Sequence, residues 1–209
     1  ITQLNVRNSQ GFHGAKSQFS MSLYNPVKEI YWTLARSDAS QLNQWFNYTD
    51  SLADNGLLEK NSILKNSNLL FNGIDRFAVK NYQYFNYLQS YLYHTKYIEG
   101  VYLYSFSLNP ENYQPSGCVN MSMINDVTLS FQTQIPPIDN DIDLFLQNKG
   151  ETHMINQIKQ GSQIEISKEL VPFLKEGEIY QYTYDLNVYI INYNVLKIMS
   201  GSAGLSYTS

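Results

Sequence analysis

Apolar and polar residues alternate along several stretches of this chain, and this period of two limits the fold more strongly than any other feature of the sequence. Successive side chains of a β-strand point to opposite faces of the sheet, so alternation indicates strands with one buried face. The longest alternating stretch is "YQYTYDLNVYII" at 180–191. The residues that share its apolar face are Tyr180, Tyr182, Tyr184, Leu186, Val188 and Ile190. Shorter alternating sets are Phe19, Met21 and Leu23; Ile30, Trp32 and Leu34; and Val127, Leu129 and Phe131. The chain is therefore predicted to consist mainly of β-strands.

Between the strands, the pattern predicts one helix and two long loops. Residues 81–93 have apolar side chains at helical spacing, and we expect this stripe to pack against the core: Tyr84, Phe85, Leu88, Tyr91 and Leu92. The segments 37–67 and 139–165 lose the alternation and are predicted to be loops. About eight strands at this spacing favour an all-β, antiparallel sandwich of the jelly-roll type or an immunoglobulin-like one.

A turn-rich segment, "NPENYQPSGCVN" at 109–120, separates two alternating stretches. Proline cannot donate a hydrogen bond to a sheet, and glycine in a turn often takes a positive φ. We therefore interpret this segment as a structural turn that joins two long antiparallel strands, 101–108 and 119–131. The residues predicted to form the turn are Asn109, Pro110, Gln114, Pro115, Ser116 and Gly117.

The composition argues against several classes of function. Only 15% of the residues are charged, against about a quarter in a typical domain, and the net charge is −4. No run of Lys and Arg offers a surface for phosphates, so direct nucleic-acid binding is not expected. No apolar run approaches the length of roughly 18 residues that a membrane span requires. The single cysteine, Cys118, excludes an intrachain disulfide and is expected to be a small buried residue of a strand.

The sequence lacks the residue constellations that catalysis or metal binding requires. Its three histidines, His13, His94 and His153, are scattered and form no H-x-H or H-E-x-x-H spacing. An acidic segment, "DNDID" at 139–143, has some likeness to a calcium loop but lacks the glycine and the distant glutamate of an EF-hand. We therefore expect no catalytic residue, no metal and no cofactor.

Four stretches resemble the major capsid proteins of nucleocytoplasmic large DNA viruses, and they occur in the order found in that family. They are "YNPVKEIYW" at 24–32, "FNGIDRF" at 71–77 with "YFNYLQSYLYHT" at 84–95, "GVYLYSFSLNPENYQPSGCVNMSMIND" at 100–126, and "YDLNVYIINYNVLKIMSGSAGLSYTS" at 184–209. In the first of them, Tyr24-Asn25 replaces the usual Asn-His of the family. The third contains the proline turn Q-P-S-G, which the resemblance identifies as a structural signature.

The resemblance implies a structural role and a fold. Proteins of this family carry two jelly rolls in tandem, and three chains form a pseudo-hexagonal capsomer of an icosahedral shell. The matching stretches belong to the second jelly roll, so residues 1–209 are expected to be a single C-terminal jelly-roll domain, with the N-terminal jelly roll absent from this chain. The implied partners are the protein itself, as a homotrimer and in neighbouring capsomers, and minor capsid proteins. Nucleic acid would not be contacted directly, and an internal membrane only indirectly. The implied location is the virion, after assembly in the host cytoplasm.

One pair of residues suggests where subunits could meet. Trp45 and Phe46 lie in the polar segment 37–67, where large exposed aromatic side chains are costly, so we hypothesise that they form an intersubunit contact. The alternative is that both rings fold back over their own sandwich. A carbohydrate-binding jelly-roll module is the second functional hypothesis, since aromatic and amide side chains suit sugars. A cupin-type enzyme is disfavoured by the histidine spacing.

Overall fold

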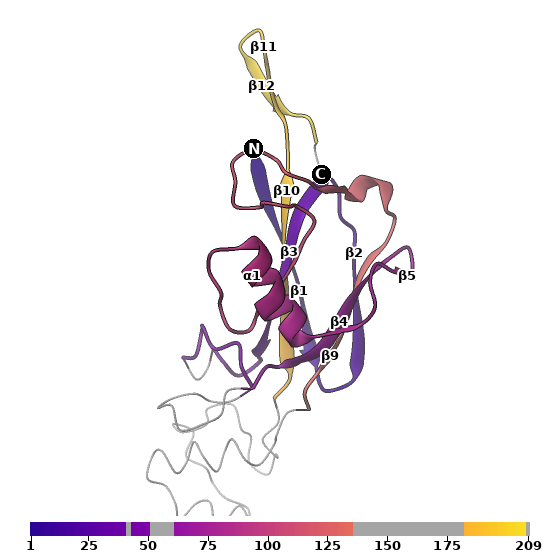
Figure 1. Ribbon diagram of the computed structural model, residues 1–209, viewed down its shortest axis with the longest axis vertical. Helices are drawn as coiled ribbons and strands as arrows, with labels where there is room; N and C mark the ends of the chain where they lie inside the picture. The colour runs from indigo at the N-terminus through magenta and orange to yellow at the C-terminus, as the bar shows by residue number, and fades with distance from the viewer. Residues whose placement is uncertain (41–42, 51–60, 136–181, 208–209) are drawn as a thin grey trace, which may run out of the picture.

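Two antiparallel β-sheets pack face to face in this protein (Figure 1). The computed structural model describes residues 1–40, 43–50, 61–135 and 182–207. The first sheet has the strand order β1 (Thr2–Phe12), β10 (Tyr184–Tyr193), β3 (Pro26–Arg36) and β7 (Val101–Ser105), and β8 (Val119–Asn120) also pairs with β3. The second has the order β2 (Lys16–Met21), β9 (Val127–Thr133), β4 (Leu64–Phe71) and β5 (Ile74–Asp75), and β6 (Lys80–Asn81) also pairs with β4.

The chain crosses repeatedly from one sheet to the other. Strands β1, β2, β3 and β4 lie alternately in the first and second sheets, and β7, β9 and β10 continue the alternation. This repeated crossing is the topology of a jelly-roll sandwich. The predicted all-β, antiparallel jelly roll with one short helix is confirmed. Strand β1 was not predicted, because its larger apolar residues, Leu4 and Val6, lie exposed on an edge strand.

The core lies between the two sheets and is built from the alternating residues that the sequence predicts. Strands β3 and β10 place directly paired residues on the inner face of the first sheet: Ile30 with Ile190, Trp32 with Val188, and Leu34 with Leu186. The second sheet contributes Leu69, Val127, Leu129 and Phe131. Each of these side chains is almost fully buried, so alternation at period two supplies the core directly.

The helix consists of one π-helical turn, Tyr84–Leu88, followed by α1, Gln89–Tyr93, and its orientation corrects one prediction. Of the apolar stripe expected to face the core, only Phe85 is fully buried. The side that faces the sandwich instead carries Asn86 and Gln89. The amide of Asn86 donates to the backbone oxygens of Ile98 (2.9 Å) and Val101 (2.7 Å), and Gln89 Oε1 accepts from the backbone N–H of Ser105 (3.2 Å).

This orientation has a physical reason. Strand β7 is at the edge of the first sheet, where backbone groups lack a neighbouring strand. A buried backbone group without a hydrogen bond costs free energy, so the polar side of the helix satisfies the edge and the apolar side turns outward.

The segment 107–118 is a loop on one sheet edge, and the prediction that it joins two long antiparallel strands is wrong. Strands β7 and β8 both pair with β3: residues 101–105 lie beside 33–29, and residues 119–120 beside 27–26. The chain thus leaves the edge after Phe106, makes an excursion, and resumes in the same direction. After a short 3-10 turn at Met121–Met123, it crosses to β9 in the other sheet.

Hydrogen bonds of Ser116 close the neck of the 107–118 loop. Its hydroxyl lies 2.6 Å from that of Ser107 and accepts from the backbone N–H of Asn109 at 2.8 Å. Its carbonyl accepts from the N–H of Leu108 at 3.4 Å. Pro110 is buried and its carbonyl accepts from Lys28 Nζ at 2.8 Å. These hydrogen bonds therefore hold the two ends of the loop together and fix its conformation.

The C-terminal strands form a separate two-stranded ribbon that projects beyond the sandwich (Figure 1). Strands β11 (Leu196–Met199) and β12 (Ser202–Leu205) pair across a tight turn at Ser200 and Gly201, whose φ angles are 51° and 80°.

Replacement of Trp32 tests the core. Trp32 is fully buried and makes an edge contact with Phe85, with ring centroids 5.0 Å apart. Its indole Nε1–H has no acceptor among the described residues. Trp32→Ala should lower the free energy of unfolding by about 3–5 kcal/mol, whereas Trp32→Phe should cost much less, since it keeps most of the ring volume and removes the unpaired donor. Urea denaturation of both variants measures the difference, and equal losses would contradict it.

Replacement of Gly117 tests the loop. Gly117 has a φ of +143°, and a Cβ atom there would lie 3.0 Å from the carbonyl oxygen of Phe106. Gly117→Val should therefore strain the neck of the loop and lower the melting temperature. Gly201→Val is the control variant. Gly201 also has a positive φ, but a Cβ atom there would meet nothing within 4 Å, and the ribbon that carries it lies outside the core. A melting temperature unchanged by Gly117→Val would contradict the expected strain.

Candidate functional site

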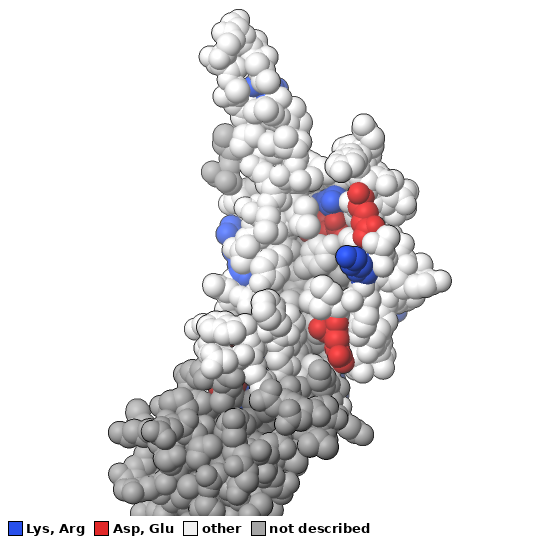
Figure 2. All heavy atoms as spheres, turned by 90° about the vertical axis from the view of Figure 1, so that its left-hand side faces the viewer, with Lys and Arg blue, Asp and Glu red and all other residues white. Residues whose placement is uncertain are grey.

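The surface of the described residues carries few charges and several large apolar side chains. Figure 2 shows one face, on which acidic and basic side chains are sparse: several lie close together toward one side, and most of the remaining described surface is uncharged. Among the places that expose large apolar groups are the pair Trp45 and Phe46, the outer face of the helix, and the C-terminal ribbon. Exposed apolar groups that gather in this way are typical of surfaces that meet another macromolecule.

Trp45 and Phe46 point away from the sandwich, with 64% and 90% of their surface exposed. The segment that carries them is tied down by the buried guanidinium of Arg36. Arg36 pairs with both carboxylate oxygens of Asp38 (2.9 and 2.7 Å) and donates to the backbone oxygen of Asp50 at 2.9 Å. Both ends of the segment are thus fixed to the end of β3, and neither ring folds back over the sandwich as the alternative reading would require.

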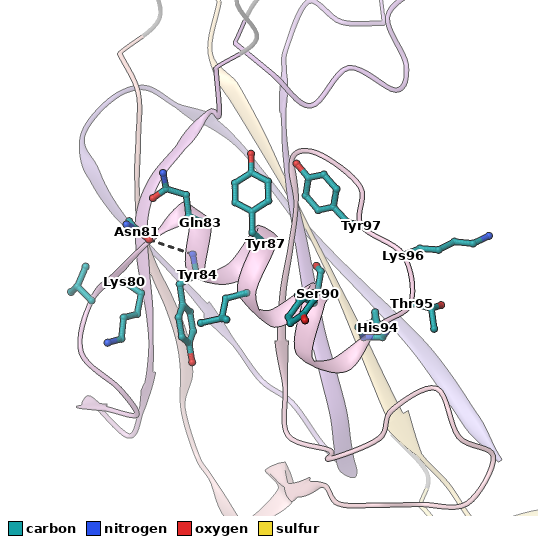
Figure 3. A pocket seen from close by; sticks show the side chains of 13 residues that line it. Lys80, Asn81, Gln83, Tyr84, Tyr87, Ser90, His94, Thr95, Lys96 and Tyr97 are labelled. Carbon is teal, nitrogen blue, oxygen red and sulfur yellow. Dashed lines mark hydrogen bonds between the residues drawn. The ribbon is translucent and has the colours of Figure 1, made fainter.

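The outer face of the helix borders a groove with a volume of about 950 Å³ (Figure 3). Tyr91 is 84% exposed, and Tyr87 and Leu88 are about half exposed. The rings of Tyr87 and Tyr97 lie 5.0 Å apart on the groove wall, and Lys80 and Lys96 also line it. The groove is therefore aromatic and apolar, with basic groups beside it.

The C-terminal ribbon has an apolar face and a rigid base. In its register, Leu196 faces Leu205 and Ile198 faces Ala203, so these residues share one face, and all are exposed. The base is held by the buried amide of Asn194, which exchanges hydrogen bonds with the backbone of Tyr207 (2.7 and 3.1 Å) and donates to Gln3 Oε1 (2.9 Å). A two-stranded ribbon alone is marginally stable in water, so this one gains from burial against a further surface.

A polar cluster lies on the outer face of β3, where sequence reasoning predicted no site. Glu29 is only 1% exposed, and its Oε2 lies 2.6 Å from His94 Nε2 and accepts from the hydroxyl of Tyr31 at 3.0 Å. Its Oε1 pairs with Lys28 Nζ at 3.2 Å. The other ring nitrogen of His94, Nδ1, lies 3.3 Å from Glu111 Oε1 of the 107–118 loop. The cluster therefore joins β3, the end of the helix and the loop.

The hydrogen bonds and charges within the cluster shift the pKa values of its members. Burial alone would lower the pKa of His94, but the hydrogen bonds and charges of Glu29 and Glu111 outweigh it and raise the pKa above 6.5. Burial alone would raise the pKa of Glu29, but His94, Tyr31 and Lys28 hold it below 4.5. The pKa of Glu111 is also lowered, chiefly by the backbone N–H of Thr95. The imidazolium form of His94 is thus favoured between two carboxylates.

Sequence reasoning missed this cluster because its members lie far apart in the chain and show no motif. The residues predicted to form the turn lie on the same loop as Glu111, and of these Asn109, Gln114, Pro115 and Gly117 are exposed. The expectation that Cys118 is buried is wrong: it lies exposed where the loop rejoins the sheet. In this part of the chain Val119 pairs with Val27, whereas Cys118 remains outside the paired register.

The described residues contain no group of three or more His, Cys, Asp or Glu side chains placed to hold a metal ion. The acidic segment with Asp139, Asp141 and Asp143 lies outside the described residues, as do His153 and the whole of the second predicted loop, 139–165. No helix among the described residues is long and apolar enough to cross a membrane.

Comparison with known proteins identifies relatives among viral capsid proteins. The family described as "Large eukaryotic DNA virus major capsid protein" matches residues 1–166. The major capsid protein of Paramecium bursaria Chlorella virus 1 is 34% identical over 152 residues, which are 72% of this chain and 30% of that protein. The major capsid protein of Pyramimonas orientalis virus is 26% identical over 223 aligned residues, covering 95% of this chain and 41% of that protein. The chain thus spans less than half the length of these relatives.

Solved structures of viral capsid proteins also match this chain. A quasi-atomic model of the PBCV-1 virus capsid matches all of this chain with a TM-score of 0.67 and 25% identity, and the match covers 51% of that capsid chain. The Faustovirus major capsid protein shares the fold, with a TM-score of 0.61 and 15% identity over 92% of this chain. These relatives are structural proteins of virions. From its sequence match and its jelly-roll fold, the chain belongs to the major capsid proteins of large eukaryotic DNA viruses.

Proposed function

We propose that this chain is the second, C-terminal jelly roll of a shell-forming protein, and that the whole protein forms trimeric, pseudo-hexagonal capsomers of an icosahedral capsid. The observation that carries the proposal is the match of the complete chain to about half of a capsid chain of PBCV-1. A jelly roll of 209 residues leaves room for a second domain of similar size in such a protein. Assembly would take place in the host cytoplasm.

The surface chemistry supports a role in self-association. A shell needs broad contacts between identical copies, and such contacts are depleted in charge and enriched in Tyr, Trp and Phe. The pair Trp45 and Phe46 and the outer face of the helix have this aromatic composition, and the C-terminal ribbon adds exposed aliphatic side chains. Minor capsid proteins are further proposed partners, whereas nucleic acid is not contacted and a membrane inside the shell is reached only through other proteins.

The particle mass of the native protein tests the proposed function. We expect light scattering on protein from its natural source to give the mass of three chains, each with two jelly rolls. A particle with the mass of this chain alone would contradict the proposal and would favour the carbohydrate-binding module instead.

A second measurement tests the contact residues. We propose that Trp45 and Phe46 anchor a contact between subunits or between capsomers. Changing both to Ala should leave the melting temperature almost unchanged, because both rings are exposed, and should weaken assembly at least ~30-fold, as loss of an aromatic hot spot of about 2 kcal/mol predicts.

The matched control is Tyr113→Ala, which removes a fully exposed aromatic ring elsewhere on the surface. Sedimentation velocity across a concentration series measures association. If the double variant assembles like the wild type, or if it loses stability together with assembly, these rings are not the anchor.

A further inference from the structure

The ring of His94 lies between two carboxylates that belong to different parts of the fold. Its Nε2 is 2.6 Å from Glu29 in β3, and its Nδ1 is 3.3 Å from Glu111 in the 107–118 loop. Glu111 also accepts from the backbone N–H (2.9 Å) and hydroxyl (3.1 Å) of Thr95. His94 is thus the one side chain of the described residues that pairs with both carboxylates, and it links the loop to the sheet.

The chemistry of imidazole makes this link depend on a proton. An imidazolium has two N–H donors and can serve both carboxylates at once, whereas a neutral ring has one donor and one lone pair. After deprotonation, one carboxylate must therefore face a lone pair. Glu29 has the shorter contact and is buried, so leaving it without this donor would cost more than leaving the half-exposed Glu111. The neutral ring therefore keeps its proton toward Glu29.

We propose that His94 is a protonation-dependent latch for the 107–118 loop: in its charged form it ties Glu111 to β3, and in its neutral form this tie is lost and Glu111 is held by Thr95 alone. The loop then retains the bonds from Thr95 and the bond from Lys28 to Pro110. It loses its ionic connection to the buried face of the sheet. The less tightly held loop carries the exposed side chains of Leu108 and Tyr113, so the latch controls the freedom of an apolar surface.

The groups around His94 set the pH range. From β3 it faces Glu29 and Tyr31, and Lys28 pairs with the other oxygen of Glu29. From the loop it faces Glu111, and Lys96 lines the groove beside it. Burial, together with the charge of Glu29, raises the pKa of Tyr31, which therefore stays a protonated donor.

The pKa shifts of these groups determine how the latch responds to pH. Because the pKa of His94 is raised above 6.5, its ion pairs contribute fully below about pH 6.5 and are lost as pH rises through the raised value. Because the pKa values of Glu29 and Glu111 lie below 4.5, the carboxylates contribute above that pH and lose the pairing as pH falls through their lowered values. The latch is thus closed in mildly acidic solution and opens toward alkaline pH.

The single cysteine allows a direct test without a new attachment site. Cys118 is exposed at the end of the loop, so a nitroxide spin label can be attached there before the titration. Electron paramagnetic resonance then reports label mobility from pH 5 to 9, and NMR of the His94 ring reports its protonation. We expect mobility to rise with pH, with the same midpoint as the His94 titration.

Glu111→Gln is the discriminating variant, since an amide can accept from the charged ring or donate to the neutral one. This variant should fold normally, because the side chain is exposed, and should keep the label immobile across the whole range. His13→Gln, at a histidine outside the cluster, should retain the wild-type curve. A flat wild-type curve while His94 titrates, or an unchanged curve in Glu111→Gln, would overturn the proposal. Both outcomes are independent of whether the protein assembles into capsomers.

Discussion

Strand β3 is buried on both of its faces, and most of the structure depends on how that burial is achieved. Its inner face packs Ile30, Trp32 and Leu34 against the second sheet. Its outer face carries Glu29 and Thr33, which are also almost completely buried. A buried carboxylate needs partners, and Glu29 finds them in His94 at the end of the helix and in Tyr31 and Lys28 of its own strand. His94 in turn pairs with Glu111, so the helix end and the 107–118 loop are both connected to this strand.

The free edge of the first sheet explains the orientation of the helix. An edge strand exposes unpaired backbone groups, and Asn86 and Gln89 satisfy several of those near β7. As a result the tyrosine and leucine side chains of the same helix point outward and form the wall of a groove. The apolar surface of the domain therefore arises from the hydrogen-bonding needs of the sheet edge, and a protein that packs against copies of itself can use such a surface.

The buried charges have a structural logic in a chain with so few charged residues. Arg36 and Glu29 both lie on β3, and each fixes a loop: Arg36 holds the segment with Trp45 and Phe46, and Glu29 holds the 107–118 loop through His94. A buried ion pair adds little net stability compared with apolar packing, but breaking one is costly, so such pairs define one arrangement of the loops against others. Charged residues of β3 therefore help to position both of these loops.

The sequence by itself determined the sandwich, its core and its family. Alternation at period two identified the inner faces of β3, β9 and β10, because side-chain direction in a strand depends only on the local backbone. Four motifs in order predicted the capsid family. The tertiary structure alone decided which way the helix faces, that residues 107–118 make an excursion along one edge, and that His94 meets Glu29 and Glu111. These features depend on partners at least 12 residues away in the sequence. Sheet edges and charges bring these partners together, and no local period encodes them.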